Sequence, residues 1–270
     1  PETTPQVKRD DLIRLGAHLI IVKNDPTRGY EASRDYLLQW QVERNLLLKK
    51  KLNLSGTIQY VHGFEDIMPG NAVLGLELAD AIRAMPEADQ ADLAQAINLL
   101  SLGGGGWAGA MAVTASEEFP QMKSIGIAGA ASPAMIVSFS EGKRVAVRLN
   151  EKALTDSGIG LTAPGYQPFQ VLQHTLFGAA AVSDPFVAEG IRLVAKLKNG
   201  KMVEGSSATG LAMLIPDPVT GKSKLEDMGI AKGSTVIIYY TGKGIDQARW
   251  AGVISGKEAP LPGGVMDRLN

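Results

Sequence analysis

Apolar residues recur at helical spacing through the first part of the chain. A helix is predicted over residues 6–23, because apolar side chains stand three or four positions apart on one face. A turn rich in Asn, Asp, Pro and Gly ends it at residues 24–29, and a second helix is predicted over residues 30–51. Its apolar residues spread over more than one face, which indicates a helix covered on several sides. The positions that carry the first pattern are Leu12, Leu15, Leu19 and Val22.

The helical pattern continues until the chain reaches a run of four glycines. A short strand is predicted at residues 57–61, followed by one helix over residues 71–85 and another from Pro86 onward. The apolar face of the last helix is formed by Leu93, Ile97 and Leu100. Because a helix interior tolerates glycine poorly, this helix is predicted to end at residues 103–106, which are all glycine.

Strand signals are stronger in the C-terminal half. Asn199 and Gly200 lie between two apolar runs and are typical of a type I′ hairpin turn. Residues 235–240 are rich in β-branched and aromatic side chains, which predicts a strand. The other expected elements are a hairpin of residues 135–139 and 145–149, a helix at 169–182, hairpin strands at 193–197 and 202–203, and a strand at 250–254 beside residues 235–240.

Helices early and strands late predict an α+β fold rather than a regular alternation of strands and helices. We expect a helical N-terminal half and a strand-rich C-terminal half that pack as one compact unit. The expected boundary separates a mainly helical subdomain with the glycine-rich segment (residues 1–122) from a mixed, strand-rich subdomain (residues 123–270), and the two can form a single domain.

Charge is segregated along the chain although the formal net charge is only −1. Residues 61–122 contain nine acidic residues and one base, whereas the N-terminal sixty residues lean to the basic side. The near-zero net charge argues against nucleic-acid binding, which needs a basic surplus. The opposite-sign segments suit packing within one chain, and they also suit head-to-tail contact between copies of the chain. The sequence has no cysteine, which excludes disulfides, thiolate metal sites and cysteine nucleophiles.

The glycine-rich segment formally matches the dinucleotide-binding pattern G-x-G-x-x-G at residues 104–109. That motif needs a strand before it, a helix after it and an acidic residue about 20 positions further on. A helical pattern precedes this segment, and no acid stands near Ile127 or Gly129. A packed structural loop is therefore the first interpretation, and a site for an anionic or nucleotide-like ligand is the alternative. Its candidate binding residues are Gly104, Gly106 and Gly109.

Candidate catalytic residues are few. His62 stands close to Glu65 and Asp66, and this group is the expected acid/base set if the protein is an enzyme. Residues 205–210 invite interpretation as a serine-nucleophile motif, but they do not fit G-x-S-x-G. The three histidines show no metal-binding spacing, so neither a metal site nor a cofactor is predicted.

Two uncharged segments, residues 93–116 and 124–140, raise the question of a membrane hairpin. Polar residues and glycines weaken the first segment and Pro133 interrupts the second, so a buried soluble core is expected instead. The leading hypothesis is a structural or assembly protein that associates with itself or docks in a larger complex. An enzyme with an anionic ligand near residues 104–109 and a secreted or membrane-active effector are the alternatives. The compartment stays open.

Overall fold

The centre of the molecule is a four-stranded parallel sheet. The computed structural model describes residues 2, 4–23, 25, 27–28, 30–51, 61, 64–150 and 152–261. The strands of the sheet are β1 (Ile97–Ser101), β2 (Lys123–Gly129), β3 (Gly178–Val182) and β4 (Val236–Ile238). Their order across the sheet is β3-β2-β1-β4, and every neighbouring pair is parallel. The central strand β1 therefore pairs with one strand that follows it closely in sequence and one that comes near the end of the chain.

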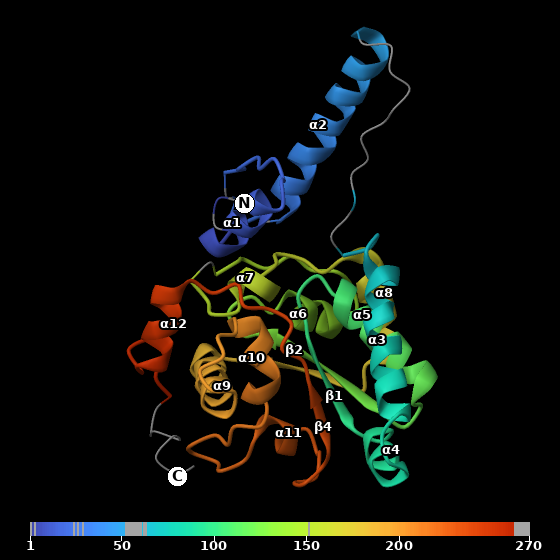
Figure 1. Ribbon diagram of the computed structural model, residues 1–270, viewed down its shortest axis with the longest axis vertical. Helices are drawn as coiled ribbons and strands as arrows, with labels where there is room; N and C mark the ends of the chain where they lie inside the picture. Colours follow the sequence, from blue (N-terminus) through green and yellow to red (C-terminus); the bar gives the residue numbers. More distant parts are fainter. Residues whose placement is uncertain are drawn as a thin grey trace.

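Helices cover both faces of the sheet, as a parallel sheet requires. Side chains alternate along β1, so that Ile97 and Leu99 face one apolar core and Leu100 faces the other. Helices α9, α10 and α12 lie on the first side of the sheet, and α3, α5 and α8 lie on the second (Figure 1). The helices are α1 (Gln6–Arg14), α2 (Tyr30–Lys51), α3 (Met68–Arg83), α4 (Glu87–Leu93), α5 (Gly106–Glu118), α6 (Ala134–Glu141), α7 (Asp156–Ile159), α8 (Tyr166–Thr175), α9 (Asp184–Leu197), α10 (Gly205–Ala212), α11 (Lys224–Asp227) and α12 (Gln247–Ile254).

The expected α+β arrangement is wrong, because strands and helices alternate and the C-terminal half is mainly helical. Three predicted strands lie in helices: residues 135–139 in α6, 193–197 in α9 and 250–254 in α12. Asn199 and Gly200 take left-handed backbone angles, as a hairpin turn would require, but they end helix α9 instead. The strand expected at residues 235–240 is confirmed by β4.

The error has a physical cause in the burial of the strands. Residues 97–101 form β1, whereas the apolar pattern there predicted the end of a helix. A parallel strand is apolar on both faces, so over a short run its periodicity cannot be told from that of a buried helix. The same confusion extended a predicted helix across residues 169–182, where α8 ends at Thr175 and β3 follows.

The N-terminal helices stand apart from this sheet. Helix α1 ends at Arg14, well before residue 23, because Gly16 adopts a φ of +86° that an L-residue disfavours. Helix α2 projects away from the other elements (Figure 1). Its side chains Leu38 and Val42 are exposed, so the expected cover on several sides is not found among the described residues. Residues 57–60, where a strand was predicted, lie outside the described ranges. In the described part of the chain, none of the helices has the length and apolarity needed to cross a membrane.

Candidate functional site

The four glycines at residues 103–106, called the glycine loop below, connect the central strand β1 to helix α5. Both elements that a phosphate-binding loop needs, a strand before it and a helix after it, are therefore present, although the helical pattern had argued against the strand. Gly105 is the N-cap residue of α5 and has a φ of +91°, a left-handed conformation that favours glycine. The loop lies at the carboxyl end of the central strand, where open parallel sheets bind ligands.

The loop is packed closely by two segments from elsewhere in the chain. Phe64 lies so near that a Cβ at Gly104 would collide with its ring, and a Cβ at Gly106 would collide with its carbonyl group. On another side, the backbone N–H of Gly165 donates a hydrogen bond of 2.9 Å to the carbonyl oxygen of Gly104. Glycine is thus required here by packing as well as by backbone conformation.

A cavity of about 190 Å³ opens at the glycine loop, and we call it the glycine-loop pocket. Residues of β1, of the start of α5 and of the segment before α3 form part of its wall. Residues that follow α9 and β4 in the sequence form another part. The polar side chains that line it are Asn71, Ser101, Glu204, Ser206 and Thr241, and the large apolar ones include Phe64 and Trp107. A cavity that combines apolar walls with a few convergent polar groups is typical of a ligand site.

The start of α5 gives this pocket an affinity for anions. The first backbone N–H groups of any helix have no partner within the helix, and the helix dipole places partial positive charge there. Helix α5 has no side-chain cap and no acidic residue in its first turn. No carboxylate of the helix's own first turn therefore competes for these N–H groups, and a phosphate or carboxylate of a ligand can bind them.

The same pocket contains one buried carboxylate. Glu204 is only 6 % exposed, yet it is well supplied with hydrogen-bond donors. The Ser206 hydroxyl donates to Glu204 Oε1 at 2.5 Å, and the Gly244 backbone N–H donates to Oε2 at 2.9 Å. The Lys8 ammonium lies 3.0 Å from the same Oε2. The pocket thus offers an anion-binding helix start together with a fixed anionic acceptor.

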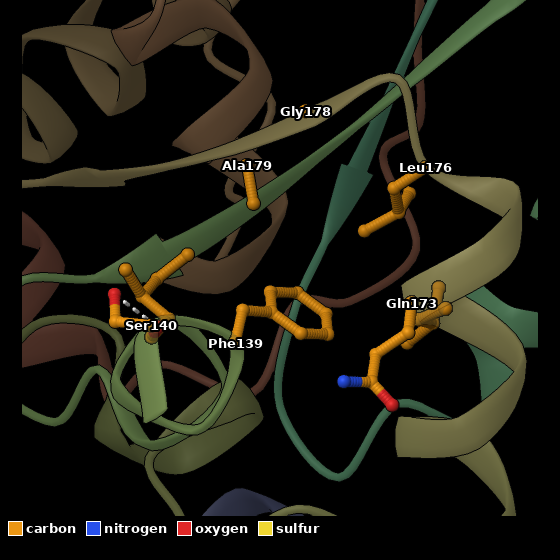
Figure 2. Close-up of a pocket in the computed structure, with 8 residues that line it drawn as sticks. Phe139, Ser140, Gln173, Leu176, Gly178 and Ala179 are labelled. Carbon is orange, nitrogen blue, oxygen red and sulfur yellow. Dashed lines mark hydrogen bonds between the residues drawn. The ribbon is translucent and has the colours of Figure 1, made fainter. Parts of the chain in front are cut away.

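A second groove lies at the sheet edge formed by β3, between α6 and α8 (Figure 2). Phe139, Leu176 and Ala179 line it, and its polar side chains are Ser140 and Gln173. The Ser140 hydroxyl donates to the Ile136 carbonyl oxygen at 3.2 Å, so it is bonded within its own helix. This groove has no charged lining residue, and we therefore take the glycine-loop pocket as the candidate site.

The structure separates the residues that the sequence singled out. Gly104 and Gly106 line the pocket, whereas Gly109 lies one turn further along α5, where it faces Met68 and α8. Glu65 accepts a hydrogen bond of 2.6 Å from the Tyr166 backbone N–H. Neither Glu65 nor Asp66 lines the pocket, although their neighbours Phe64 and Ile67 do. His62 lies outside the described residues. Within those residues, no group of three or more acidic or histidine side chains is placed to hold a metal ion.

The sequence alone does not indicate Ser101, Glu204 or Thr241, and it brings in Ser206 only as one of two serines in the segment 205–210. These residues come from three distant stretches of the chain, so no local motif connects them. A positional signal exists for two of them: Ser101 ends β1 and Thr241 follows β4, and ligands bind at the carboxyl ends of parallel strands.

A buried network of hydrogen bonds in the sheet contacts the wall of the pocket. The Tyr239 hydroxyl donates to Asn98 Oδ1 at 2.8 Å, and Asn98 Nδ2 donates to the Ser124 hydroxyl at 3.0 Å. The Tyr239 ring meets the Trp107 ring edge to face, with 5.2 Å between their centroids. This network links β1, β2 and the end of β4 to a side chain that lines the pocket.

We expect Tyr239→Phe to lower the free energy of unfolding by about 1–3 kcal/mol at neutral pH, because Asn98 loses a donor inside the core. Burial raises the pKa of Tyr239 above its ordinary value. The unfolded chain therefore loses this proton first, and the tyrosine's contribution to stability is present below a pH of about 10 and falls as the pH rises above it. Urea unfolding at several pH values should show a smaller alkaline loss in the variant. The exposed Tyr36→Phe is the control, and an identical alkaline slope in wild type and Tyr239→Phe would contradict the prediction.

Comparison with known proteins identifies the family of the chain. Residues 1–242 match the family model described as pyridoxal-phosphate dependent enzyme, and the chain therefore belongs to that family. The prediction of a structural or assembly protein is wrong, since the family is one of enzymes. Self-association and the division at residue 122 stay predictions.

Two curated relatives are similar to the chain in sequence. It is 30% identical to L-threonine ammonia-lyase of Geobacter sulfurreducens over 226 residues, which are 83% of this chain and 49% of that protein. It is 28% identical to the putative threonine dehydratase of Sinorhizobium fredii over 256 residues, 94% of this chain and 66% of that protein. The chain thus spans 49% of the length of the first relative and 66% of the second.

The solved structures show the shared fold. The processed form of threonine deaminase isoform 2 from Solanum lycopersicum superposes with a TM-score of 0.70 at 21% identity, over 97% of this chain and 65% of that one. Diaminopropionate ammonia lyase from Escherichia coli superposes with a TM-score of 0.73 at 17% identity, over 95% of this chain and 63% of that one.

Proposed function

We propose that this chain binds pyridoxal phosphate in the glycine-loop pocket and takes part in the release of ammonia from a small hydroxyl-bearing amino acid. The observation that carries the proposal is the uncapped start of α5, which follows the glycine loop at the end of the central strand. Membership of the pyridoxal-phosphate family supports the cofactor. The names of the two curated relatives, a threonine ammonia-lyase and a putative threonine dehydratase, support the reaction.

The residues of the pocket fit this cofactor. Its phosphate needs several backbone N–H donors, which the glycine loop and the first turn of α5 supply, and that turn carries no acidic side chain. Its ring needs apolar walls and a few polar partners at the rim, for which Trp107, Ser206 and Thr241 are available in the same pocket. Glu204 adds a carboxylate that its donors hold in place.

Bound pyridoxal phosphate supplies an electron sink that stabilises negative charge on the α-carbon of an amino acid. The chain contributes position and electrostatics. The glycine loop and α5 anchor the anionic end of the ligand, and the buried hydroxyl of Ser206 is oriented by its bond to Glu204. The apolar walls around Phe64 and Trp107 reduce the access of water, which strengthens each of these polar interactions.

We expect the purified protein to bind pyridoxal phosphate saturably, as measured by a titration followed by absorbance and tryptophan fluorescence. Inorganic phosphate should compete, because both ligands use the helix start. Pyridoxal without phosphate should bind at least about 10-fold more weakly, since charge-assisted hydrogen bonds to the phosphate are absent. Equal affinity for pyridoxal and for pyridoxal phosphate would show that the glycine loop does not bind the phosphate group.

The reaction is tested on the protein loaded with pyridoxal phosphate. L-Threonine and L-serine should yield ammonia and the corresponding 2-oxo acid, whereas L-alanine, which has no β-hydroxyl to lose, should not. Ammonia release no faster than with free pyridoxal phosphate would overturn the proposed reaction and leave the proposed binding site to be judged by the titration.

A further inference from the structure

An ion pair joins helix α1 to a carboxylate of the glycine-loop pocket. Lys8 projects from α1 and places its ammonium 3.0 Å from Glu204 Oε2, at the mouth of a small cavity that residues 241–244 also line. The Glu204 side chain is 7% exposed and the Lys8 side chain is 35% exposed. The carboxylate therefore belongs to the interior, and the ammonium approaches it from the surface.

The surroundings of Glu204 are shaped to hold this carboxylate. A Cβ at Gly158, Gly242 or Gly244 would meet the Glu204 side chain, and one at Gly244 would also collide with Lys8. The backbone at these three glycines therefore lies close to the ion pair. A larger residue at any of them would displace the Glu204 side chain. The pair occupies a defined place in the fold, because its partners approach from α1, from the segment before α10 and from the loop after β4.

The charges in this pocket pose a problem that Lys8 resolves. A ligand bound through a phosphate brings negative charge into a cavity that already contains the Glu204 carboxylate. Like charges in a partly buried site repel each other strongly, because the surrounding medium screens them less than water does. An ammonium that shares the carboxylate reduces this repulsion and fixes the carboxylate at the same time.

We propose that Lys8 is a positioning residue of the cofactor site, which compensates the charge of Glu204 and makes helix α1 part of that site. The inference rests on the proposed binding of pyridoxal phosphate in the glycine-loop pocket. Lys8 acts through Glu204, so its effect on the affinity for the cofactor depends on the presence of the Glu204 charge.

A double-mutant cycle tests this dependence, with the dissociation constant of pyridoxal phosphate as the readout. Lys8→Met should weaken binding roughly 10-fold, a value kept modest by the exposure of the lysine to solvent. In the Glu204→Gln background the same substitution should change the affinity by less than about 2-fold, since no carboxylate is left to compensate. Lys8→Arg should retain most of the affinity because it keeps the charge.

Lys224→Met is the control, because Lys224 also pairs with a carboxylate, that of Asp227, but lines neither the glycine-loop pocket nor the cavity beside Lys8. It should leave the affinity unchanged. Circular dichroism of every variant establishes that it is folded. If Lys8→Met weakens binding equally in both backgrounds, or in neither, Lys8 does not act through Glu204 and the inference is overturned while the proposed function stands. If the unsubstituted protein does not bind pyridoxal phosphate, the proposed function and this inference fall together.

Discussion

We expect Gly106→Ala to reduce the affinity for pyridoxal phosphate by at least about 100-fold, the scale of effect that a displacement of about 1 Å has in a preorganised site. Gly106 is the first residue of α5, and a Cβ there would overlap the carbonyl group of Phe64. Because that obstacle is backbone, it cannot rotate away as a side chain would. The start of α5 must shift instead, and the N–H groups that face the phosphate move with it.

Gly109→Ala provides the matched control in the same helix. A Cβ at Gly109 would lie 3.2 Å from the sulfur of Met68, at the flexible end of a side chain. Alanine in a helix interior is favoured over glycine by up to about 1 kcal/mol, so this variant should be as stable as the wild type and should bind equally well. Titration and circular dichroism of both variants decide the matter. Normal binding by Gly106→Ala, or an equal loss in both variants, would show that the loop does not anchor the phosphate.

The second large effect concerns stability. Arg192→Met should lower the free energy of unfolding by about 3–5 kcal/mol, because it leaves the Glu189 carboxylate buried without its counter-charge. The Glu189 side chain is 2% exposed and the Arg192 side chain 9% exposed, with 2.9 Å between Arg192 Nε and Glu189 Oε2. Arg192 also donates to the carbonyl oxygen of Val253 at 2.8 Å, which ties α9 to α12. Urea denaturation measures the loss.

Two further variants test whether the uncompensated charge of Glu189 causes the loss of stability. Replacing Glu189 and Arg192 together with methionine should recover most of the stability, since a buried apolar pair has no desolvation penalty. Lys224→Met, in the exposed pair with Asp227, should change the stability by no more than about 0.5 kcal/mol. A loss in the double variant as large as that in Arg192→Met would indicate lost packing rather than an uncompensated charge.

The sequence predicted helices better than strands, and the reason lies in their surroundings. The second predicted helix is confirmed by α2, and the predicted helix at residues 71–85 corresponds to α3. The buried, apolar run of β1 predicts a helix because this strand is covered on both faces, and the sequence of β3, Gly-Ala-Ala-Ala-Val, has no polar alternation that would indicate a strand. Because β1 is a central strand of the sheet, the helix predicted in its place also hides the alternation of strands and helices that indicates a parallel fold.

The candidate site was accessible from the sequence only in part. Gly104 and Gly106 could be identified because consecutive glycines form a recognisable local motif. Glu204 and Thr241 leave none, since they reach the pocket through pairing of β1 with β4 and through the packing of α10 on the sheet. Such residues become visible only when the topology of the sheet is known.

The pairing of β1 with β4 also determines when the pocket can exist during synthesis. The ribosome releases β1 and the glycine loop long before β4, although Ile97 and Val236 are direct partners. Contacts between residues so far apart in the chain form slowly and late, because a long loop must close first. The nascent chain therefore carries an exposed glycine loop and an unpaired edge of β1 until almost all of the described chain has emerged. Over that interval the edge can pair with other chains, as unpaired strand edges do.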